Sequence, residues 1–368
     1  MSQLLWKQVL TQGLSETSQS FNSQQLKVFS HLTRCKTESA GVEIYECNDC
    51  GYQMQALRSC RDRHCPSCQY RSTIKWCDAR RQDILPVTYY HLVFTLPSEF
   101  NGWVSCYPEV IYRLLFESVW QTLSKFGQDK KRLNGQLGML SVLHTWGQTL
   151  ARHVHLHCLV PGGALGDSGD WHQAKSTYLF PVKALSRHYR GNFVSRLREA
   201  KKQGLLDKIP DDKFSQTLDQ VMGKAWVVYS KPATYGHDKL IDYLGRYTKR
   251  IALTPNRLIN LKDNQVSLKY RDYRDNKSKV MKLSSEELLR RYALHILPKG
   301  FMRVRYHGFL ANAVRAEKLQ AIRRALKVVK VKTEDKALIV KGNPCCPDCG
   351  KNRWHYVGVI NRLHWNPG

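Results

Sequence analysis

The 368-residue sequence lacks every pattern that would place a protein in a membrane. No apolar run reaches the roughly 18 residues that a membrane helix needs. The N-terminal stretch MSQLLWKQVL has no signal-peptide pattern, and neither end of the chain forms a basic amphipathic anchor. These absences predict a soluble protein of the cytoplasm with no membrane partner.

The sequence is also short of acidic residues. Asp and Glu together number 30 against 58 Lys and Arg, which gives a formal net charge of +28. An excess of this size indicates a polyanionic partner, and nucleic acid is the first candidate because the membrane patterns are missing. Hydrophobic residues make up 42% of the chain, which is enough for the cores of two or three ordinary domains.

Cysteine is plentiful, but disulfides are not expected. The twelve cysteines cluster in CxxC pairs, in a long chain without a signal peptide, which favours zinc. Two such pairs, Cys47–Cys50 and Cys65–Cys68, are separated by fourteen residues. Each pair can present two thiolates from a tight turn, and two pairs complete a closed tetrahedral site. We therefore predict a structural Zn²⁺ ion bound by Cys47, Cys50, Cys65 and Cys68.

Further sulfur and imidazole ligands surround these pairs. Two more pairs of ligand types, each with a spacing of four, can hold a second Zn²⁺ ion, namely His31, Cys35, Cys60 and His64. The alternatives are that these side chains are buried or free, or that all the ligands are partitioned differently between one or two ions. Near the C-terminus Cys346 and Cys349, with His355 as a third ligand, form a weaker zinc candidate.

Arginines near the cysteine pairs indicate a task for this domain. Arg61, Arg63 and Arg71 carry fixed positive charge and donors suited to DNA phosphates. We expect the zinc-binding domain to bind DNA.

Three histidines alternate in the stretch WGQTLARHVHLHCLVPGG, residues 146–163. Residues two apart in a strand line one face, so His153, His155 and His157 form a row of imidazoles that can hold a metal ion. Val154 and Leu156 between them can pack into a core on the opposite face. The alternative is a half-buried strand whose histidines need only hydrogen-bond partners.

Strands and helices are predicted to mix without regular alternation, which favours an α+β fold with an antiparallel sheet. Besides the histidine strand, strand patterns occupy Thr88–Pro97, Gly138–Trp146 and Ala225–Ser230. Helical patterns cover residues 1–34, 106–126, 185–204, 286–294 and 311–331. Residues 257–283 are strand-like and place Tyr270 and Tyr273 among basic residues. This pattern suits either contact with single-stranded DNA or an ordinary amphipathic hairpin.

A pair of tyrosines stands in the segment HDKLIDYLGRYTKR, residues 237–250, which is predicted to be a helix. Tyr243 and Tyr247 are four apart and lie on one helix face, next to the phosphate-binding candidates Arg246, Lys249 and Arg250. The alternative is that both rings pack into a core. A tyrosine hydroxyl, with a pKa of about 10, is a poor nucleophile at neutral pH, and a divalent ion on the phosphate would help it.

Several segments in one order resemble the two-tyrosine rolling-circle transposases of the insertion-sequence-91 family, which are HUH endonucleases. His155-Leu156-His157 is similar to their His-hydrophobic-His motif, and YLGRY at residues 243–247 is similar to their paired tyrosines. The likeness continues in SCRDRHCPSCQ (59–69), YYHLVFTLP (89–97) and LHILPKGFMRVRYHGFLAN (294–312). It runs through most of the chain.

The resemblance implies a fold. We expect an HUH-type antiparallel sheet with flanking helices that carry the tyrosines, joined to an N-terminal zinc-binding domain. The expected divisions are residues 1–82 (helical, zinc-binding and DNA-binding), 86–256 (HUH endonuclease), 257–340 (basic DNA-contacting region) and 341–368 (tail with a CxxC pair).

The resemblance also implies the chemistry of a transposase. Single-stranded DNA would be cleaved and rejoined through 5′-phosphotyrosine links at Tyr243 and Tyr247, with Mg²⁺ or Mn²⁺ bound by His155 and His157. The third ligand comes from varied positions in HUH enzymes, and we expect His153 or Gln148. The family commonly has His-Pro-His where this chain has His153-Val154-His155, a departure that keeps both HUH histidines.

The expected partners are single-stranded and hairpin DNA of transposon ends and target DNA, at the bacterial nucleoid. No GxxxxGK[ST] phosphate loop is present, so strand separation is expected from host helicase or replication proteins. A plasmid replication initiator or relaxase would share the histidines and a tyrosine but not the cysteine-rich module. A non-catalytic zinc-dependent regulator would leave the histidine row and the tyrosine pair without a purpose.

Overall fold

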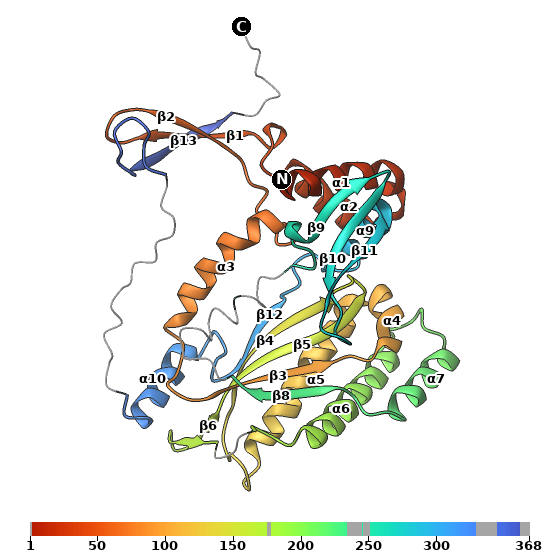
Figure 1. Ribbon diagram of the computed structural model, residues 1–368. Coiled ribbons are helices and arrows are strands. Elements are labelled where there is room, and N and C mark those ends of the chain that lie inside the picture. Colours follow the sequence, from red (N-terminus) through yellow and green to blue (C-terminus); the bar gives the residue numbers. More distant parts are fainter. Residues whose placement is uncertain (1, 175–177, 234–244, 246–250, 329–343, 361–368) are drawn as a thin grey trace. The chain divides into compact units, whose positions relative to one another are not determined.

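The structure of the protein is a computed structural model, shown in Figure 1, which describes residues 2–174, 178–233, 245, 251–328 and 344–360. The chain divides into two compact units that do not follow its order. The sheet unit contains residues 79–248 and 297–331, and the zinc unit contains residues 1–78, 249–296 and 332–368. The predicted range 257–340 is therefore split between the units, and the predicted tail belongs with the N-terminal segments.

The sheet unit is built on a five-stranded antiparallel sheet with the strand order β12-β4-β5-β3-β8. Its strands are β3 (Tyr89–Thr95), β4 (Gly138–Trp146), β5 (Arg152–Pro161), β8 (Val228–Pro232) and β12 (Val304–Gly308). The strand with the alternating histidines, β5, lies at the centre of the sheet (Figure 1). This sheet confirms the predicted α+β fold.

Alternation along β5 decides which face of the sheet is the core. Val154, Leu156 and Cys158 are buried in one hydrophobic cluster with side chains of four helices. These helices are α4 (Asn101–Cys106), α5 (Pro108–Gln128), α6 (Val182–Lys202) and α7 (Asp211–Met222). Burying a side chain of leucine size contributes about 1.5–3 kcal/mol. The apolar face of β5 is therefore held against the helices, and its histidines lie on the opposite face.

Strand β8 differs from its prediction. It begins at Val228, not Ala225, and it continues to Pro232, beyond the predicted end at Ser230. Trp226 precedes the strand and packs among aromatic rings of the core, with its ring centroid 5.1 Å from that of Tyr189. Among the described strands, β8 pairs with β3 alone, and an edge strand tolerates proline because one side of its backbone needs no ladder partner.

At its other edge the sheet is joined by β12 and helix α10 (Arg315–Ala325). The ring of Tyr306 on β12 lies between the guanidinium groups of Arg80 and Arg315, whose carbons are 5.9 and 5.3 Å from the ring centroid. Both arginines pair with Asp83, at 3.0 and 3.3 Å. The helix is shorter than the predicted range 311–331. It ends before Lys327, whose φ of 52° is not helical. A two-stranded ribbon, β6 (Gly163–Leu165) with β7 (Trp171–Gln173), completes the unit.

The zinc unit begins with two helices, α1 (Ser2–Thr17) and α2 (Ser23–Arg34), where residues 1–34 were predicted to be helical. A capping box starts α2, because the Asn22 side chain accepts from the Gln25 N–H and the Gln25 side chain accepts from the Asn22 N–H. Helix α1 packs against α9 (Ser285–Ala293), with the rings of Trp6 and Tyr292 centred 5.2 Å apart. This packing joins the N-terminal helices to a segment from the second half of the chain.

Two three-stranded sheets belong to the zinc unit. The first has the order β13-β1-β2 and consists of β1 (Val42–Cys47), β2 (Gln53–Leu57) and β13 (Trp354–Ile360), so a strand from near the C-terminus completes it. The second has the order β11-β10-β9, from β9 (Leu258–Lys262), β10 (Gln265–Arg271) and β11 (Ser278–Ser284). Helix α3 (Pro66–Arg81) follows β2 in the chain.

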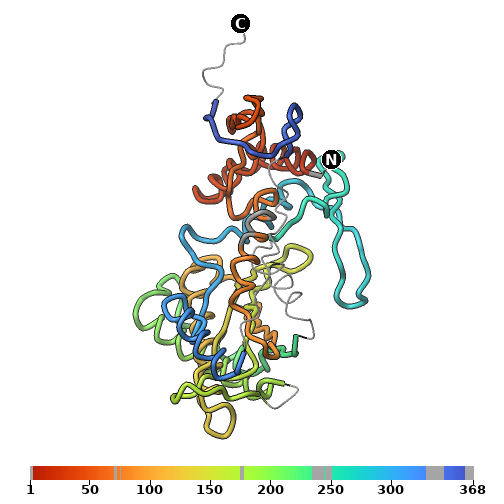
Figure 2. The backbone as a smooth tube through the Cα atoms, turned by 90° about the vertical axis from the view of Figure 1, so that its left-hand side faces the viewer, coloured from red at the N-terminus to blue at the C-terminus, as the bar shows by residue number. Residues whose placement is uncertain are grey.

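The β9–β11 sheet is amphipathic. Val266 and Leu268 of β10 are fully buried, whereas Lys269 and Arg271, which alternate to the other face of the strand, are exposed. The tube in Figure 2 traces β10 and β11 as a long narrow hairpin. Residues 258–284 form an amphipathic hairpin sheet, with Tyr270 on the face opposite to Lys269 and Arg271, and contact of this segment with single-stranded DNA stays a prediction.

Among the described residues, no helix combines the length and the apolar character that a membrane crossing requires.

Candidate active site and metal centres

Three imidazoles converge on the face of the central sheet opposite the helical core. They belong to His144 on β4 and to His155 and His157 on β5, and one ring nitrogen from each lies within 4.8 Å of the others. His144 stands directly opposite His155 in the antiparallel register, which places both side chains on one face. This His cluster, defined as His144, His155 and His157, has the donor set of a divalent-metal site.

Hydrogen bonds orient the rings of the His cluster. Nδ1 of His155 is 2.9 Å from the carbonyl oxygen of His153, and because a carbonyl only accepts, this nitrogen donates. Nε2 of His155 then has a lone pair, and it lies 3.1 Å from Nε2 of His157. Burial lowers the pKa of His155 to about 4, so the ring is neutral at pH 7, as a metal ligand must be. The residues present therefore fit a divalent cation.

A fourth histidine, His91, contacts the cluster through the ring of His157. Nε2 of His91 on β3 lies 2.8 Å from Nδ1 of His157, and the two rings stack with centroids 5.1 Å apart. Burial lowers the pKa of His91 to about 4, so at pH 7 this neutral ring can accept a hydrogen bond. When His157 donates from Nδ1, its Nε2 lone pair faces the cluster, which is the usual arrangement of a metal-bound histidine and its outer partner.

The third imidazole comes from a residue that the sequence analysis did not name. His144 takes the position expected for His153 or Gln148. His153 lies on the same face but is exposed at the start of β5, where the register with β4 shifts, and it is not part of the cluster. Gln148 lies in the turn between β4 and β5. In the sequence, His91 and His144 each stand in a predicted strand. Only the pairing of these strands with β5 shows that both residues lie next to His155 and His157.

The predicted nucleophiles cannot be placed. Tyr243 and Tyr247, with Arg246, Lys249 and Arg250, lie outside the described residues. The described strand that precedes them, β8, pairs with β3, and its Tyr229 ring is centred 6.2 Å from the ring of His91. The chain therefore enters the tyrosine segment from a strand whose side chains reach the residues around the His cluster.

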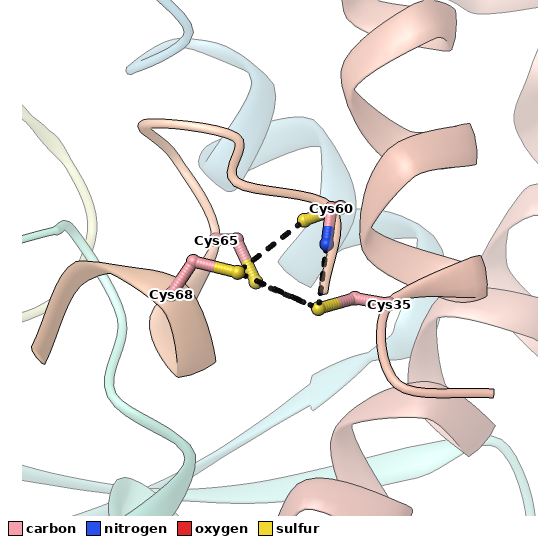
Figure 3. A group of neighbouring side chains, drawn as sticks. All are labelled: Cys35, Cys60, Cys65 and Cys68. Atoms are coloured by element: carbon pink, nitrogen blue, oxygen red, sulfur yellow. Dashed lines mark hydrogen bonds between the residues drawn. The ribbon is translucent and has the colours of Figure 1, made fainter. Parts of the chain in front are cut away.

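A first sulfur cluster forms where α2, the loop after β2 and the start of α3 meet (Figure 3). It consists of Cys35, Cys60, Cys65 and Cys68. Its sulfur–sulfur distances include 3.6 Å from Cys35 to Cys68 and 3.7 Å from Cys60 to Cys68. Four thiolates at Zn–S bonds of about 2.3 Å in a tetrahedron would stand about 3.8 Å apart, so these spacings fit Zn²⁺.

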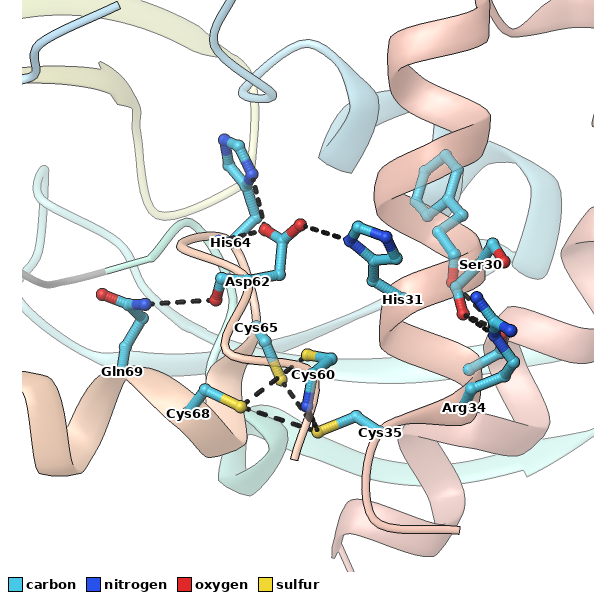
Figure 4. A network of polar contacts seen from close by, with 12 residues as sticks. Ser30, His31, Arg34, Cys35, Cys60, Asp62, His64, Cys65, Cys68 and Gln69 are labelled. Carbon is cyan, nitrogen blue, oxygen red and sulfur yellow. Dashed lines mark hydrogen bonds and ion pairs between the residues drawn. The ribbon is translucent and has the colours of Figure 1, made fainter. Parts of the chain in front are cut away.

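His31 and His64, which were candidate ligands, bind a carboxylate instead. Nδ1 of each lies 3.0 Å from an oxygen of Asp62, and Asp62 also accepts from the backbone N–H of His64 at 2.8 Å (Figure 4). Burial alone would raise the pKa of Asp62, but the hydrogen bonds from His64 and His31 bring it to about 2. These bonds hold the loop between Cys60 and Cys65 in shape.

A second sulfur cluster joins the two ends of the chain. It consists of Cys47, Cys50, Cys346 and Cys349, with sulfur–sulfur distances of 3.5 Å from Cys47 to Cys349 and from Cys50 to Cys346. Asp49, in the turn between Cys47 and Cys50, pairs with Lys351 at 3.1 Å and with Arg353. Nδ1 of His355 lies 2.6 Å from the side-chain oxygen of Asn48 in the same turn. His355 thus contacts the turn between Cys47 and Cys50 through a hydrogen bond and is not in the cluster.

The predicted zinc site of Cys47, Cys50, Cys65 and Cys68 is therefore wrong. The β1–β2 hairpin carries Cys47 and Cys50 away from the second pair, and Cys346 and Cys349 complete their cluster because β13 pairs with β1. Of the predicted phosphate ligands, Arg61 has a side chain that is 79% exposed, Arg63 is half-buried, and Arg71 stands in α3. Arg61 is the more accessible of the first two.

Two segments of the chain match family models, and most of the chain matches two known transposases. Residues 138–318 match a family model described as "Putative transposase", and residues 5–96 match one described as "Transposase zinc-binding domain". The putative transposase y4qJ of Sinorhizobium fredii is 38% identical over 316 residues, which cover 83% of this chain and 79% of the relative. The transposase for insertion sequence element IS801 of Pseudomonas savastanoi pv. phaseolicola is 27% identical over 322 residues, covering 83% and 74%. No solved structure matches.

Zinc content tests the two sulfur clusters. We expect two Zn²⁺ ions per chain by elemental mass spectrometry, and one ion after Cys346→Ser with Cys349→Ser, because two thiolates alone do not hold the metal in a closed site. Cys345→Ser is the matched control, since Cys345 is an exposed neighbour outside the cluster, and it should keep both ions. Two ions in the double variant would contradict the assignment.

Metal titration separates His144 from His153. In calorimetry of the zinc-loaded protein with Mn²⁺, His144→Ala should weaken Mn²⁺ binding by more than about tenfold. Loss of a residue that only orients a ligand already weakens binding about tenfold, and loss of a ligand itself should weaken it more. His153→Ala should stay within about twofold, because its ring is outside the cluster. The opposite ranking would return the third ligand to His153.

The role of His91 is measured in the same titration. His91→Ala should weaken Mn²⁺ binding about 10–100-fold through the lost orientation of His157. His91→Gln keeps an acceptor for the His157 ring and should recover part of the affinity. Unchanged binding by the alanine variant would show that His91 does not position the ligand.

Proposed function

Because the chain belongs to the insertion-sequence-91 family of transposases, we propose that it cleaves and rejoins single-stranded DNA at transposon ends through 5′-phosphotyrosine intermediates. The observation that carries the proposal is the His cluster on β4 and β5, in which one ring nitrogen from each of three histidines lies within 4.8 Å of the others. A non-catalytic DNA-binding regulator would need no such cluster of histidines.

The His cluster would hold Mg²⁺ or Mn²⁺, with His144, His155 and His157 as ligands and His91 as the residue that orients His157. The bound ion would polarise a non-bridging oxygen of the scissile phosphate and make its phosphorus more electrophilic. The protein contributes ring orientation, through the carbonyl of His153 and the ring of His91, and a rigid sheet that keeps the donors in place.

Tyr243 or Tyr247 would be the nucleophile. The phenolic oxygen forms a bond to phosphorus, the bond from phosphorus to the 3′ oxygen breaks, and that oxygen leaves as a 3′ hydroxyl after taking up the proton that the phenol releases. In the reverse step a 3′ hydroxyl attacks the phosphotyrosine and frees the phenol. Since the phosphodiester is exchanged and not hydrolysed, rejoining needs no ATP, and two tyrosines allow two such links at once.

The zinc unit would bind the same DNA outside the scissile bond. Arg61 offers an exposed guanidinium for phosphates, and Arg63, Arg71, Arg246, Lys249 and Arg250 are further proposed contacts. Single-stranded and hairpin ends and the target DNA are the proposed substrates. Host helicase or replication proteins would supply strand separation.

Covalent attachment tests the proposed function. The protein is incubated with Mg²⁺ or Mn²⁺ and single-stranded oligonucleotides of the element's ends that carry a label at the 3′ end. Denaturing electrophoresis should then show a protein-linked labelled fragment that protease removes. Tyr243→Phe and Tyr247→Phe should each reduce the adduct, and the double variant should abolish it, because phenylalanine lacks the attacking oxygen.

Tyr178→Phe is the matched control, since Tyr178 is an exposed tyrosine of the sheet unit outside the proposed site, and it should leave the adduct unchanged. An adduct that persists in the Tyr243 and Tyr247 double variant would move the nucleophile elsewhere. No adduct from the unaltered protein would overturn the proposed chemistry.

A further inference from the structure

The β9–β11 sheet of the zinc unit presents a basic face. Strand register places Ser267 between Asn260 and Lys282 and pairs Lys269 with Val280, so these side chains share one side of the sheet. The basic members of this side, called here the outer face, are Lys262, Lys269, Arg271 and Lys282. All four are exposed.

The orientation of the outer face is held by burial on the other side. Val266 and Leu268 are fully buried, and Leu288 and Leu289 of α9, the helix that follows β11, are fully buried as well. Helix α9 contacts both β10 and β11. Because side chains alternate in a strand, burial of Val266 and Leu268 keeps Lys269 and Arg271 turned outward.

Acidic neighbours distinguish the outer face from the hairpin tip. At the tip, Asp272 pairs with Arg274 at 2.9 Å and with Lys279 at 2.8 Å, and Asp275 pairs with Lys279 at 2.7 Å, so these cations are already neutralised. The strands β9, β10 and β11 contain no Asp or Glu. Within the described part of the chain, none of the four outer-face cations forms an ion pair with a carboxylate. Their charge is left for an outside partner.

The chemistry of the outer face favours double-stranded DNA. Surfaces for single strands combine cations with aromatic rings on which bases stack. Here Tyr270 lies on the opposite face, paired with Lys279, and the outer face of the strands carries no aromatic residue. Regularly spaced cations on a narrow ribbon suit the phosphates of a duplex, whose major groove admits a two-stranded β-ribbon.

We propose that the outer face of β9–β11 binds the backbone of double-stranded DNA, the duplex stem of a hairpin end or the duplex beside it. This inference rests on the proposed action on DNA ends and adds a duplex-binding surface separate from the His cluster. Binding through it releases counterions from the duplex, so affinity depends on salt.

Fluorescence anisotropy tests this surface in the full-length, zinc-loaded protein. The probes are a labelled blunt duplex of mixed sequence and labelled oligo(dT), each titrated at several salt concentrations. Lys269→Ala, Arg271→Ala and Lys282→Ala combined should weaken duplex binding at least about tenfold. The slope of log affinity against log salt should become about 2–3 shallower, for three lost phosphate contacts. Affinity for oligo(dT) should stay within about twofold.

The matched control removes three exposed lysines of the sheet unit, Lys130, Lys131 and Lys213, and should leave duplex binding unchanged. Lys269→Arg with Lys282→Arg keeps the charge and should keep the affinity, and an unchanged zinc content shows that the unit is folded. Unchanged duplex affinity and salt slope in the alanine variant, or equal losses for both probes, would overturn the proposal. The covalent adduct on a single-stranded substrate should persist in the alanine variant, so failure here is distinguishable from failure of the cleavage chemistry.

Discussion

The register between β4 and β5 is the constraint on which the candidate active site depends. It pairs His144 with His155 and Val142 with His157, which gathers three imidazoles from two strands on one face. A slip of one residue would turn the histidines toward the helices and expose the apolar residues between them. Leu156 and its buried neighbours therefore hold the three imidazoles in place, since their burial against α4–α7 specifies the register. The pairing of β3 with β5 brings His91 next to His157.

The zinc unit joins three segments that are far apart in the chain. One sulfur cluster connects the end of α2 to the start of α3. The other connects the turn at Cys47–Cys50 to the turn at Cys346–Cys349. Because metal binding to such clusters contributes directly to folding free energy, each cluster stabilises contacts that local sequence could not maintain. Asp62, held between His31 and His64, shows how the loops around a cluster gain their own polar support. The basic β9–β11 sheet is anchored in the same unit by its buried valine and leucine.

Local patterns predicted the elements well, and partners across strands poorly. The bounds of β4 match the prediction, and the alternation of β5 correctly separated its histidine face from its apolar face. His144 and His91 each stand alone in a strand, so no spacing in the sequence connects them to His155 and His157. Likewise, the nearest cysteine pairs in the sequence were assigned to one zinc ion, but the β1–β2 hairpin separates them and β13 brings Cys346 and Cys349 instead. The paired tyrosines remain predictions because they lie outside the described residues.

The central claim is that the sheet gathers His144, His155 and His157 around one divalent ion. Anomalous X-ray diffraction from crystals of the protein soaked in Mn²⁺ tests it most directly, because the manganese signal locates the ion independently of the protein atoms. The account predicts one manganese peak bonded to a ring nitrogen of each of these three residues, with His91 hydrogen-bonded to His157. A peak coordinated by His153 in place of His144, or no peak on this face of the sheet, would contradict it.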